Sequence, residues 1–409
     1  MSIRSSVLLI LSLLGSAASA QNKPAKTLDI YFVDTEGGLA ALYVSPTGES
    51  LLIDTGNAGG RDTDRIMECA KAAGVTQIDY LIITHYHSDH IGGLEELSKR
   101  IPIKHFIDHG ASGEDTPAIQ AALKMYAGLY TSANHMVAKP GDKIPITGLN
   151  VEVVTSAMKV LKTPIAGAPG AGKPNPECAT FKPRDESHVD PDNRYSVGSV
   201  IAFGKFRTIN LGDFTWNAEQ DLMCPNNNIG TVDLYLTSHH GIDQSGSPAL
   251  VHALHPRVAM MHNSTRKGGA IQTMQILHTS PGLEDIWQMH WAYAAGMEQN
   301  SPGLFIANIE EPETLANVLL NPPPTFGQPG AGGRGAPPVP GTPPAPGTPP
   351  AAGAAANPQG GRGAGGGGGR GRGGHNGPAF YIKVSAQADG TFTVTNTRNG
   401  FSKTYEAKK

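Results

Sequence analysis

Three histidines and one aspartate stand within six residues, at the spacing H-x-H-x-D-H, in the segment Thr84–Gly93 (THYHSDHIGG). This segment follows the apolar run Tyr80–Ile83, which predicts a buried strand. The loop after such a strand is where α/β folds place their chemistry. Imidazole nitrogens and carboxylate oxygens are ligands that Zn²⁺ accepts, and four of them exceed what one catalytic zinc takes from a single loop. The spacing therefore indicates two neighbouring metal ions, with a polar histidine-rich surface loop as the alternative.

Three further stretches share one form, a strand that ends in a possible ligand. They are LLIDTGNAGG with Asp54, INLGDFTW with Asp213, and LYLTSHHG with His239 and His240. Taken in order with the histidine loop, these stretches resemble the motifs of the metallo-β-lactamase-fold hydrolases, over about residues 28–310.

The resemblance implies a set of metal ligands. One ion is held by His85 and His87, and the other by Asp89 and His90. Asp213 bridges the two ions, and either His239 or His240 is the last ligand. The histidine that is not a ligand is left to bind substrate or to protonate a leaving group, so Asp89, His239 and His240 are the catalytic candidates. Asp54 is expected to hydrogen-bond the metal loop rather than the metal. Zinc is the first expectation for both ions, and manganese or iron suits the same ligands.

A longer run narrows the resemblance. DNRYSVGSVIAFGKFRTINLGDFTW, followed by SHHG, is similar to the phosphodiesterase-like branch of the family, which includes ComEC-type competence proteins and phosphorylcholine esterases. In that branch Asn193 and Ser196 stand where β-lactamases carry another histidine ligand, and we expect them to support the site. His188 lies off the pattern and is expected to be a hydrogen-bonded loop residue. Aspartate at position 213, where many β-lactamases use cysteine, favours phosphoester, lactone or thioester substrates over β-lactams.

The function implied is that of an exported hydrolase that uses a metal-bound hydroxide. Its substrate is expected to be a small molecule or a phosphodiester, either nucleic acid or a phosphorylated component of the cell envelope. Nucleic acid is then a substrate only. The alternatives are a lactone, thioester or β-lactam hydrolase of the same fold, or a non-catalytic binding protein of the envelope.

A basic segment offers a possible substrate contact. In Met261–Gly269 (MHNSTRKGG), a strand is predicted to end and a helix to begin. Asn263, Arg266, Lys267 and the backbone amides of the two glycines would receive a phosphate at the helix N-terminus. An ordinary basic capping turn explains the same residues equally well.

The elements around these motifs predict an α/β fold. A pattern of two strands, a helix and a strand occurs twice, which indicates a four-layer αββα sandwich with the metals at one edge. The segment 62–74 is expected to be a helix that begins at Asp62 as N-cap and ends at Gly74. Residues 379–409 alternate in polarity around Ala388–Gly390 and predict a β-hairpin that packs on the main domain.

The first twenty residues are typical of a secretory signal peptide. Arg4 precedes the short apolar run Val7–Leu14, and Ala18–Ala20 forms a small-residue cleavage site, so cleavage is expected after Ala20. No predicted segment is a membrane span. The mature protein is therefore expected to be secreted or periplasmic. In that setting Cys178 and Cys224 are expected to form a disulfide, and Cys69 to stay a buried thiol.

Composition separates a linker from the folded part. Residues 322–378 are rich in proline and glycine and are expected to be a disordered insertion. They carry four arginines and no acid, and the formal net charge of the chain is −3. Without these arginines and Arg4 the remainder carries about −8, which argues against a broad groove that tracks nucleic-acid phosphates. The organisation expected is a signal peptide (1–20), a metallo-hydrolase domain (21–321), the linker (322–378) and the C-terminal hairpin (379–409).

Overall fold

Two nine-stranded β-sheets face each other in the structure, a computed structural model that describes residues 26–130, 134–292, 300, 303–309 and 379–408. The predicted signal peptide (1–20) and linker (322–378) lie outside the described residues. Within the described part of the chain, no helix is both long and apolar enough to cross a bilayer.

Each sheet is built largely from one half of the chain. The first sheet has the order β18-β17-β16-β1-β2-β3-β4-β5-β6, and the second the order β15-β14-β13-β12-β11-β10-β8-β7, with β9 paired to β8. The strands of the first sheet are β1 (Leu28–Phe32), β2 (Ala41–Val44), β3 (Ser50–Ile53), β4 (Ile78–Ile82), β5 (Ile103–Asp108), β6 (His135–Val137), β16 (Ile382–Ala386), β17 (Phe392–Asn396) and β18 (Ser402–Tyr405). Those of the second are β7 (Lys143–Ile144), β8 (Asn150–Ser156), β9 (Lys159–Val160), β10 (Gly198–Phe203), β11 (Phe206–Asn210), β12 (Leu234–Leu236), β13 (Val258–Met261), β14 (Asp285–His290) and β15 (Ile306–Asn308).

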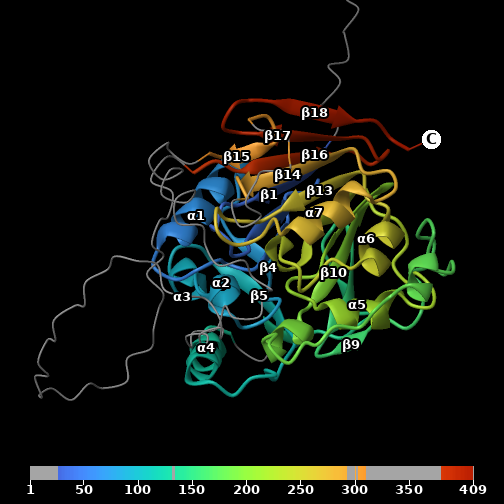
Figure 1. Cartoon of the computed structure of the whole chain (residues 1–409). Coiled ribbons are helices and arrows are strands. Elements are labelled where there is room, and N and C mark those ends of the chain that lie inside the picture. Colours follow the sequence, from blue (N-terminus) through green and yellow to red (C-terminus); the bar gives the residue numbers. More distant parts are fainter. Residues whose placement is uncertain (1–25, 131–133, 293–299, 301–302, 310–378, 409) are drawn as a thin grey trace, which may run out of the picture.

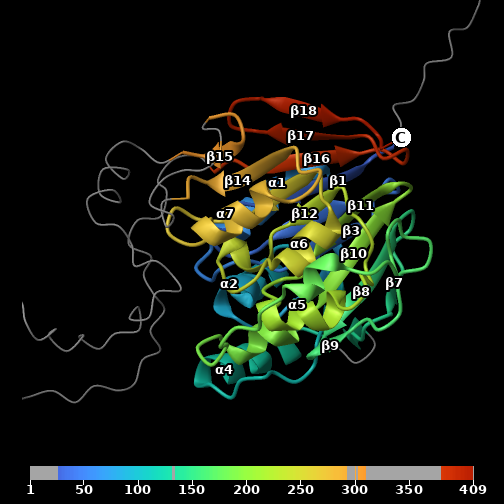
Figure 2. The ribbon, with the colours of Figure 1, turned by 45° about the vertical axis from the view of Figure 1, so that its right-hand side comes forward.

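Helices cover the outer face of each sheet, as Figures 1 and 2 show. On the first sheet lie α1 (Arg61–Ala73), α2 (Ser88–Ile91), α3 (Leu94–Ser98) and α4 (Pro117–Ala127). On the second lie α5 (Trp216–Met223), α6 (Pro248–Leu254) and α7 (Ile271–His278). One apolar core fills the space between the sheets and includes Phe32 and Trp287. One further core lies between each sheet and its own helices, so the predicted αββα sandwich is confirmed.

The parallel strands explain where the functional loops meet. Strands β3, β4 and β5 are parallel neighbours in the first sheet, and β11, β12, β13 and β14 are parallel neighbours in the second. The carboxyl ends of parallel strands share an edge, so the loops that follow β3, β4, β11 and β12 collect at one end of the sandwich. All four motifs lie on these loops.

Two expectations about helix starts are wrong. Helix α1 has Gly60 as its N-cap instead of Asp62, and the Asp62 carboxylate accepts the backbone N–H of Asn57 at 2.7 Å. The expected left-handed glycine at its end is present, because Gly74 has φ 70°. Helix α7 begins at Ile271, later than the sequence indicates, since Gly268 and Gly269 adopt positive φ in the preceding loop.

The C-terminal segment contains the predicted hairpin and one strand more. Strands β16 and β17 pair antiparallel, β18 adds to β17, and β16 pairs with β1, so the segment extends the first sheet. The backbone N–H of Phe380 donates to Asn308 Oδ1 at 2.9 Å, which holds the start of this segment against β15. Cys178 and Cys224 are joined by a disulfide, and Cys69 is a buried free thiol.

Candidate metal centre

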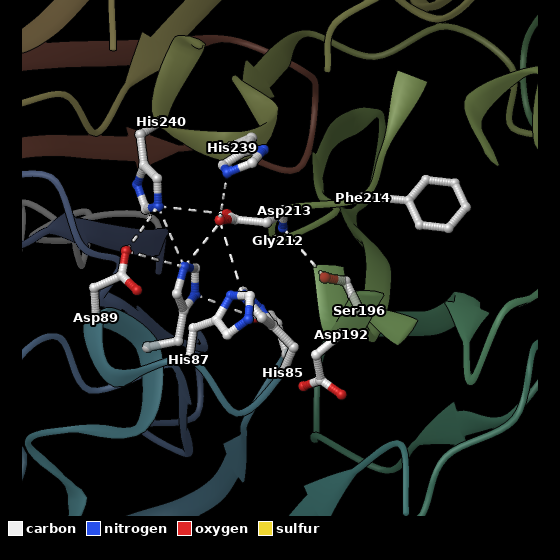
Figure 3. A network of polar contacts seen from close by, with 12 residues as sticks. His85, His87, Asp89, Asp192, Ser196, Gly212, Asp213, Phe214, His239 and His240 are labelled. Atoms are coloured by element: carbon white, nitrogen blue, oxygen red, sulfur yellow. Dashed lines mark hydrogen bonds and ion pairs between the residues drawn. The ribbon is translucent and has the colours of Figure 1, made fainter. Parts of the chain in front are cut away.

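The histidine loop begins at the end of β4 and continues into the short helix α2. The turn of α2 carries Asp89 and His90 toward the second sheet, while His85 and His87 precede it in extended backbone. Asp213 arrives from the loop after β11, and His239 and His240 from the turn after β12. Figure 3 shows six of these side chains pointing toward one another from the two sheets, namely His85, His87, Asp89, Asp213, His239 and His240.

One group of donor atoms surrounds His90. His90 Nε2 lies 3.2 Å from His240 Nε2, 3.3 Å from Asp213 Oδ1 and 3.7 Å from Asp89 Oδ2. His240 Nε2 lies 3.3 Å from Asp89 Oδ2 and 3.4 Å from Asp213 Oδ1. Ligand atoms at about 2.0–2.2 Å from one tetrahedral ion are about 3.3–3.6 Å apart, so these four atoms have the separation of a single coordination shell.

A second group lies on the other oxygen of Asp213. His85 Nε2 is 2.9 Å from His87 Nδ1 and 3.9 Å from Asp213 Oδ2. His239 Nε2 approaches the same Oδ2 atom at 3.2 Å. Asp213 therefore presents one oxygen to each group, as expected of a residue between two cations.

The donor set fits divalent metal ions. Two unprotonated ring nitrogens that face each other repel unless a proton or a metal ion lies between them, and this arrangement occurs at His85–His87 and again at His90–His240. His85, His90 and Asp213 form one possible metal-binding triplet, and Asp89, His90 and His240 form another. All the histidine and carboxylate ligands implied by the sequence thus converge on one small volume.

The pKa values of the ionisable groups in the site are strongly shifted. Burial, followed by the neighbouring rings of His90 and His87, lowers the pKa of His85 well below its usual value. The pKa of His90 is instead raised well above its usual value, because Asp213, Asp89 and Asp54 outweigh the effect of burial. Burial raises the pKa of Asp213, but His239, His240 and His90 reverse this and hold the pKa well below the ordinary range. The carboxylates are therefore ionised and ready to bind a cation.

Two further carboxylates orient the loop histidines. Asp54 Oδ2 lies 2.7 Å from His90 Nδ1, and Asp54 Oδ1 accepts the backbone N–H of Thr84 at 2.7 Å. Glu114 Oε1 lies 2.8 Å from His87 Nε2. Each carboxylate leaves the other ring nitrogen directed at the donor group, which is how metal-binding histidines are commonly fixed.

The Asn193–Ser196 element supports the site from the side of Asp213. Ser196 Oγ accepts the backbone N–H of Asp213 at 3.2 Å, and Asn193 is buried at the wall of the adjacent cleft. Asp192, the residue before this element, accepts N–H bonds from Tyr86 and Gly113 at 2.8 Å each. The element thus links the histidine loop, the loop after β5 and the Asp213 loop.

The turn that carries His239 and His240 is strained. Both residues have positive φ, 52° and 55°, in the left-handed region that ordinary side chains seldom adopt. Gly268 lies directly against this turn, and a Cβ atom at that position would be 2.1 Å from the His240 carbonyl oxygen. The glycine of the basic segment is therefore needed for close packing against the metal-site turn.

A cleft of about 1280 Å³ opens at the site. His87, Asp89, Asp213, His239 and Lys267 lie on its inner wall. His240 lies behind this wall, so His239 is the member of the pair that faces the cleft. His188 is exposed at the side of the cleft and contacts neither donor group, in keeping with a loop position.

Of the three residues expected to bind substrate, the structure places one in the wall of the cleft. Lys267 lines the cleft and pairs with Asp89. Asn263 is buried, donates to the carbonyl of His290 at 2.7 Å and accepts its backbone N–H, so its amide is used inside the fold. Arg266 is not among the residues that line the cleft. Helix α7 begins at Ile271, so the two glycines belong to the loop before the helix and not to its first turn.

The supporting roles of Glu114 and Asp192 were not predicted from the sequence. Glu114 lies in a loop and Asp192 in a short 3-10 helix, and their partners are in a different part of the chain. A signal for Glu114 was available, since the run Phe106–Glu114 (FIDHGASGE) has the form of a strand followed by polar loop residues, which the other motifs share. Asp192 has no comparable pattern.

Comparison with known proteins agrees with this architecture. The family model of the metallo-beta-lactamase superfamily matches residues 34–222. The chain is 23% identical over 230 residues to competence protein ComA of Neisseria gonorrhoeae, which covers 56% of this chain and 26% of that protein. It is 30% identical over 96 residues to an atrochrysone carboxyl ACP thioesterase of Aspergillus terreus, which covers 23% of this chain and 30% of that protein. The chain spans less than a third of the length of each of these relatives.

Among solved structures, the metallo-beta-lactamase fold protein YhfI of Bacillus subtilis aligns with a TM-score of 0.39 and 12% identity. The alignment covers 64% of this chain and 96% of that one. The matched family model, the two stacked sheets and the four motifs at one edge of them show that this chain has the metallo-beta-lactamase fold.

Proposed function

We propose that this protein is an exported, metal-dependent hydrolase of phosphodiesters. The observation that carries the proposal is Asp213, whose two oxygens face two histidine-containing donor groups at the inner wall of an open cleft. Divalent ions held there would polarise the scissile group and lower the pKa of water toward neutrality. The phosphodiester branch is supported by the aspartate at position 213 and by the Asn193–Ser196 element.

Lys267 and His239 would have different roles toward such a substrate. Lys267 is the only lysine or arginine among the described residues that line the cleft, and it lies beside Asp89, where it would attract one anionic phosphoryl oxygen. His239 faces the cleft, and burial lowers its pKa to about 3, so its ring is neutral at ordinary pH. Its Nε2 atom, next to Asp213 Oδ2, is placed to accept a proton from the attacking water.

A panel of substrates tests the proposal. Protein loaded with zinc or manganese should cleave bis-p-nitrophenyl phosphate, and removal of metal or the Asp213→Ala substitution should abolish cleavage. Nitrocefin should be hydrolysed slowly or not at all. Replacement of His239 by Ala should lower the rate by about 10²–10⁴-fold, the usual contribution of a positioned proton acceptor. The matched control is His188→Ala, a histidine of the same cleft that contacts neither donor group. Fast nitrocefin turnover without phosphodiesterase activity would contradict the proposal.

A second candidate is an acyl ester, lactone or thioester hydrolase. It is favoured by the uncharged wall that α4 contributes to the cleft, because such a wall suits an acyl chain. The discriminating measurement is the ratio of kcat/KM for p-nitrophenyl esters and thioesters to that for the phosphodiester on the same metal-loaded sample.

Export is part of the proposal. It rests on the pattern of the first twenty residues, and the Cys178–Cys224 disulfide favours an oxidising compartment. Sequencing the N-terminus of the mature protein should find Gln21, and peptide mapping without reduction should recover the Cys178–Cys224 pair. An intact N-terminus on protein recovered from the cytoplasm would contradict export.

A further inference from the structure

One wall of the cleft is an uncharged helical face. Helix α4 contributes Ala118, Ala121, Ala122 and Met125 to this wall, at the three- and four-residue spacing that places side chains on one side of a helix. Ala118 and Ala121 are exposed there, and Ala122 and Met125 are half-buried. The charged and amide residues of the helix, Lys124 and Gln120, do not line the cleft.

This apolar surface reaches the donor groups. Ile91 follows His90 in α2, and Ile242 follows the His239–Gly241 turn, and both line the same cleft. A molecule whose scissile group lies at Asp213 would therefore meet uncharged surface immediately beyond it. From Ala118 to Met125 the lining part of α4 spans seven residue steps, which is about 10 Å of helix. That distance suits a medium-length chain or an aromatic group.

The remaining walls disfavour a polyanion. Glu95, Asp185 and Asp190 also line the cleft, and Lys267 is the only described lysine or arginine on it. The flanking phosphates of a nucleic acid would face these carboxylates without cations to neutralise them, whereas binding to nucleic acid depends on such neutralisation. A substrate with one charged group and one neutral arm avoids this repulsion.

We propose that the site takes an amphipathic substrate, in which a hydrolysable group with at most one charge carries an alkyl, acyl or aryl arm that lies along α4. The reacting group itself rests on the proposed function. The apolar arm gains binding energy because it removes the alanine and methionine surface of α4 from water. The arm is thus the feature by which the cleft selects its substrate.

The test is a series of p-nitrophenyl alkyl phosphodiesters from methyl to octyl, assayed with the metal-loaded full chain. We expect kcat/KM to rise with each added methylene, by up to about fourfold where the methylene becomes fully buried. In the Ala121→Glu variant the ratio of octyl to methyl kcat/KM should fall toward one, because a carboxylate then stands in the path of the arm. The matched control is Gln120→Glu, a neighbouring exposed position on the same helix with the same change in charge, which should keep the wild-type ratio. Ala118→Glu is a second variant, in the first helical turn where an acidic residue is tolerated.

Binding separates this inference from the proposed reaction. Alkylphosphonates from methyl to octyl need no turnover, and calorimetry should show their affinity for the metal-loaded protein rising with chain length and losing that trend in Ala121→Glu. Such a trend without phosphodiester cleavage would refute the reaction and leave the apolar arm in place. Cleavage with no chain-length trend in either assay, or DNA as a better substrate than the octyl diester, would overturn the inference.

Discussion

The two histidines after β12 both approach Asp213, but their other surroundings differ. His240 Nε2 lies within 3.4 Å of Asp89, His90 and Asp213, whereas His239 Nε2 lies 3.2 Å from Asp213 and faces the cleft. The two neighbours in sequence therefore have different tasks, because the left-handed turn points them to different sides of the same carboxylate. His240 completes a donor group, and His239 lines the cleft.

The metal content of single-residue variants should distinguish the metal ligands from His239. The wild-type protein is expected to bind about two divalent ions per chain, and Asp213→Ala or His87→Ala should lose much of that content. His240→Ala should reduce bound metal more than His239→Ala does, while His239→Ala should reduce the rate more than the metal content. Elemental analysis after dialysis against metal-free buffer measures this, with His252→Ala as a histidine control remote from the site. Full occupancy in both Asp213→Ala and His87→Ala would refute the assignment.

Glu114 should be needed to orient His87. Replacing it with glutamine keeps its size but removes the negative charge beside His87 Nε2, so metal affinity should fall by about 10–100-fold, as is typical when such a partner is lost. Competition with a chromophoric chelator measures the change. Glu95→Gln is the control, since Glu95 lines the same cleft but pairs with Lys99. Equal metal affinity in the Glu114 and Glu95 variants would show that Glu114 has no such role.

The donor residues could be predicted because each lies in a short motif directly after a strand. A run of apolar residues shows where a strand ends, and a cluster of histidines and aspartates there identifies the site. The carboxylates that support the site could not be predicted in this way. The bond from Tyr86 to Asp192 spans 106 positions and that from Asp192 to Glu114 spans 78, and such contacts depend on how the loops pack. The use of the Asn263 amide inside the fold could not be predicted for the same reason, since its partner His290 belongs to a strand that the sequence did not reveal.

At the scale of elements, α5 fixes the loop that joins the His239–His240 turn to α6. The buried carboxylate of Glu219 in α5 accepts the backbone N–H groups of Gly246 and Ser247, each at 2.7 Å. Burial raises the pKa of Glu219 from 4.5 to about 8. This carboxyl group therefore holds a proton more tightly in the folded protein than in the unfolded chain.

The stability that Glu219 contributes should depend on pH. Because its folded pKa is raised, the contribution is fully present below about pH 4.5 and is lost as the pH rises through about 8. In Glu219→Gln, the free energy of unfolding should decline less between pH 5 and pH 8 than in the wild type. Urea denaturation across this range measures it, with Glu68→Gln as the exposed control on α1. Parallel pH profiles for wild type and Glu219→Gln would contradict the prediction.

Elements with strong periodicity were predicted more accurately than short edge strands. Strands β3, β4, β12 and β13 were recognised, since each contains a short continuous run of apolar residues. Strands such as β7 and β9 have two residues each, which is too short for a pattern. The start of α7 was misplaced because Gly268 and Gly269 were taken as the beginning of the helix. Gly268 instead lies in the loop before the helix, in close contact with the His240 carbonyl.

At the scale of the whole molecule, the first sheet contains strands from both ends of the described chain. Strand β16 lies beside β1, and the side chains of Val384, Phe392 and Tyr405 enter the core between the sheets. Phe380 is hydrogen-bonded to Asn308, so the described residues on either side of the 310–378 segment already touch. Residues 379–408 are therefore part of the domain, although the predicted linker separates them from it in sequence.

Removing the linker and removing the last strands should consequently have opposite outcomes. Deletion of 322–378 leaves 310–321 to connect two points that are already in contact, and each halving of loop length saves about 0.6 kcal/mol of closure entropy, so stability should be unchanged or slightly higher. Deletion of 379–409 should leave the protein insoluble or unfolded, because it exposes the edge of β1 and opens the core. Phe392→Ala is the milder test and should cost about 3–5 kcal/mol, with Ser402→Ala, on the exposed strand β18, as its control. Urea denaturation and hydrolysis of a small phosphodiester measure both. If removal of 322–378 abolished hydrolysis while the fold survived, the segment would belong to the site and would not be a linker.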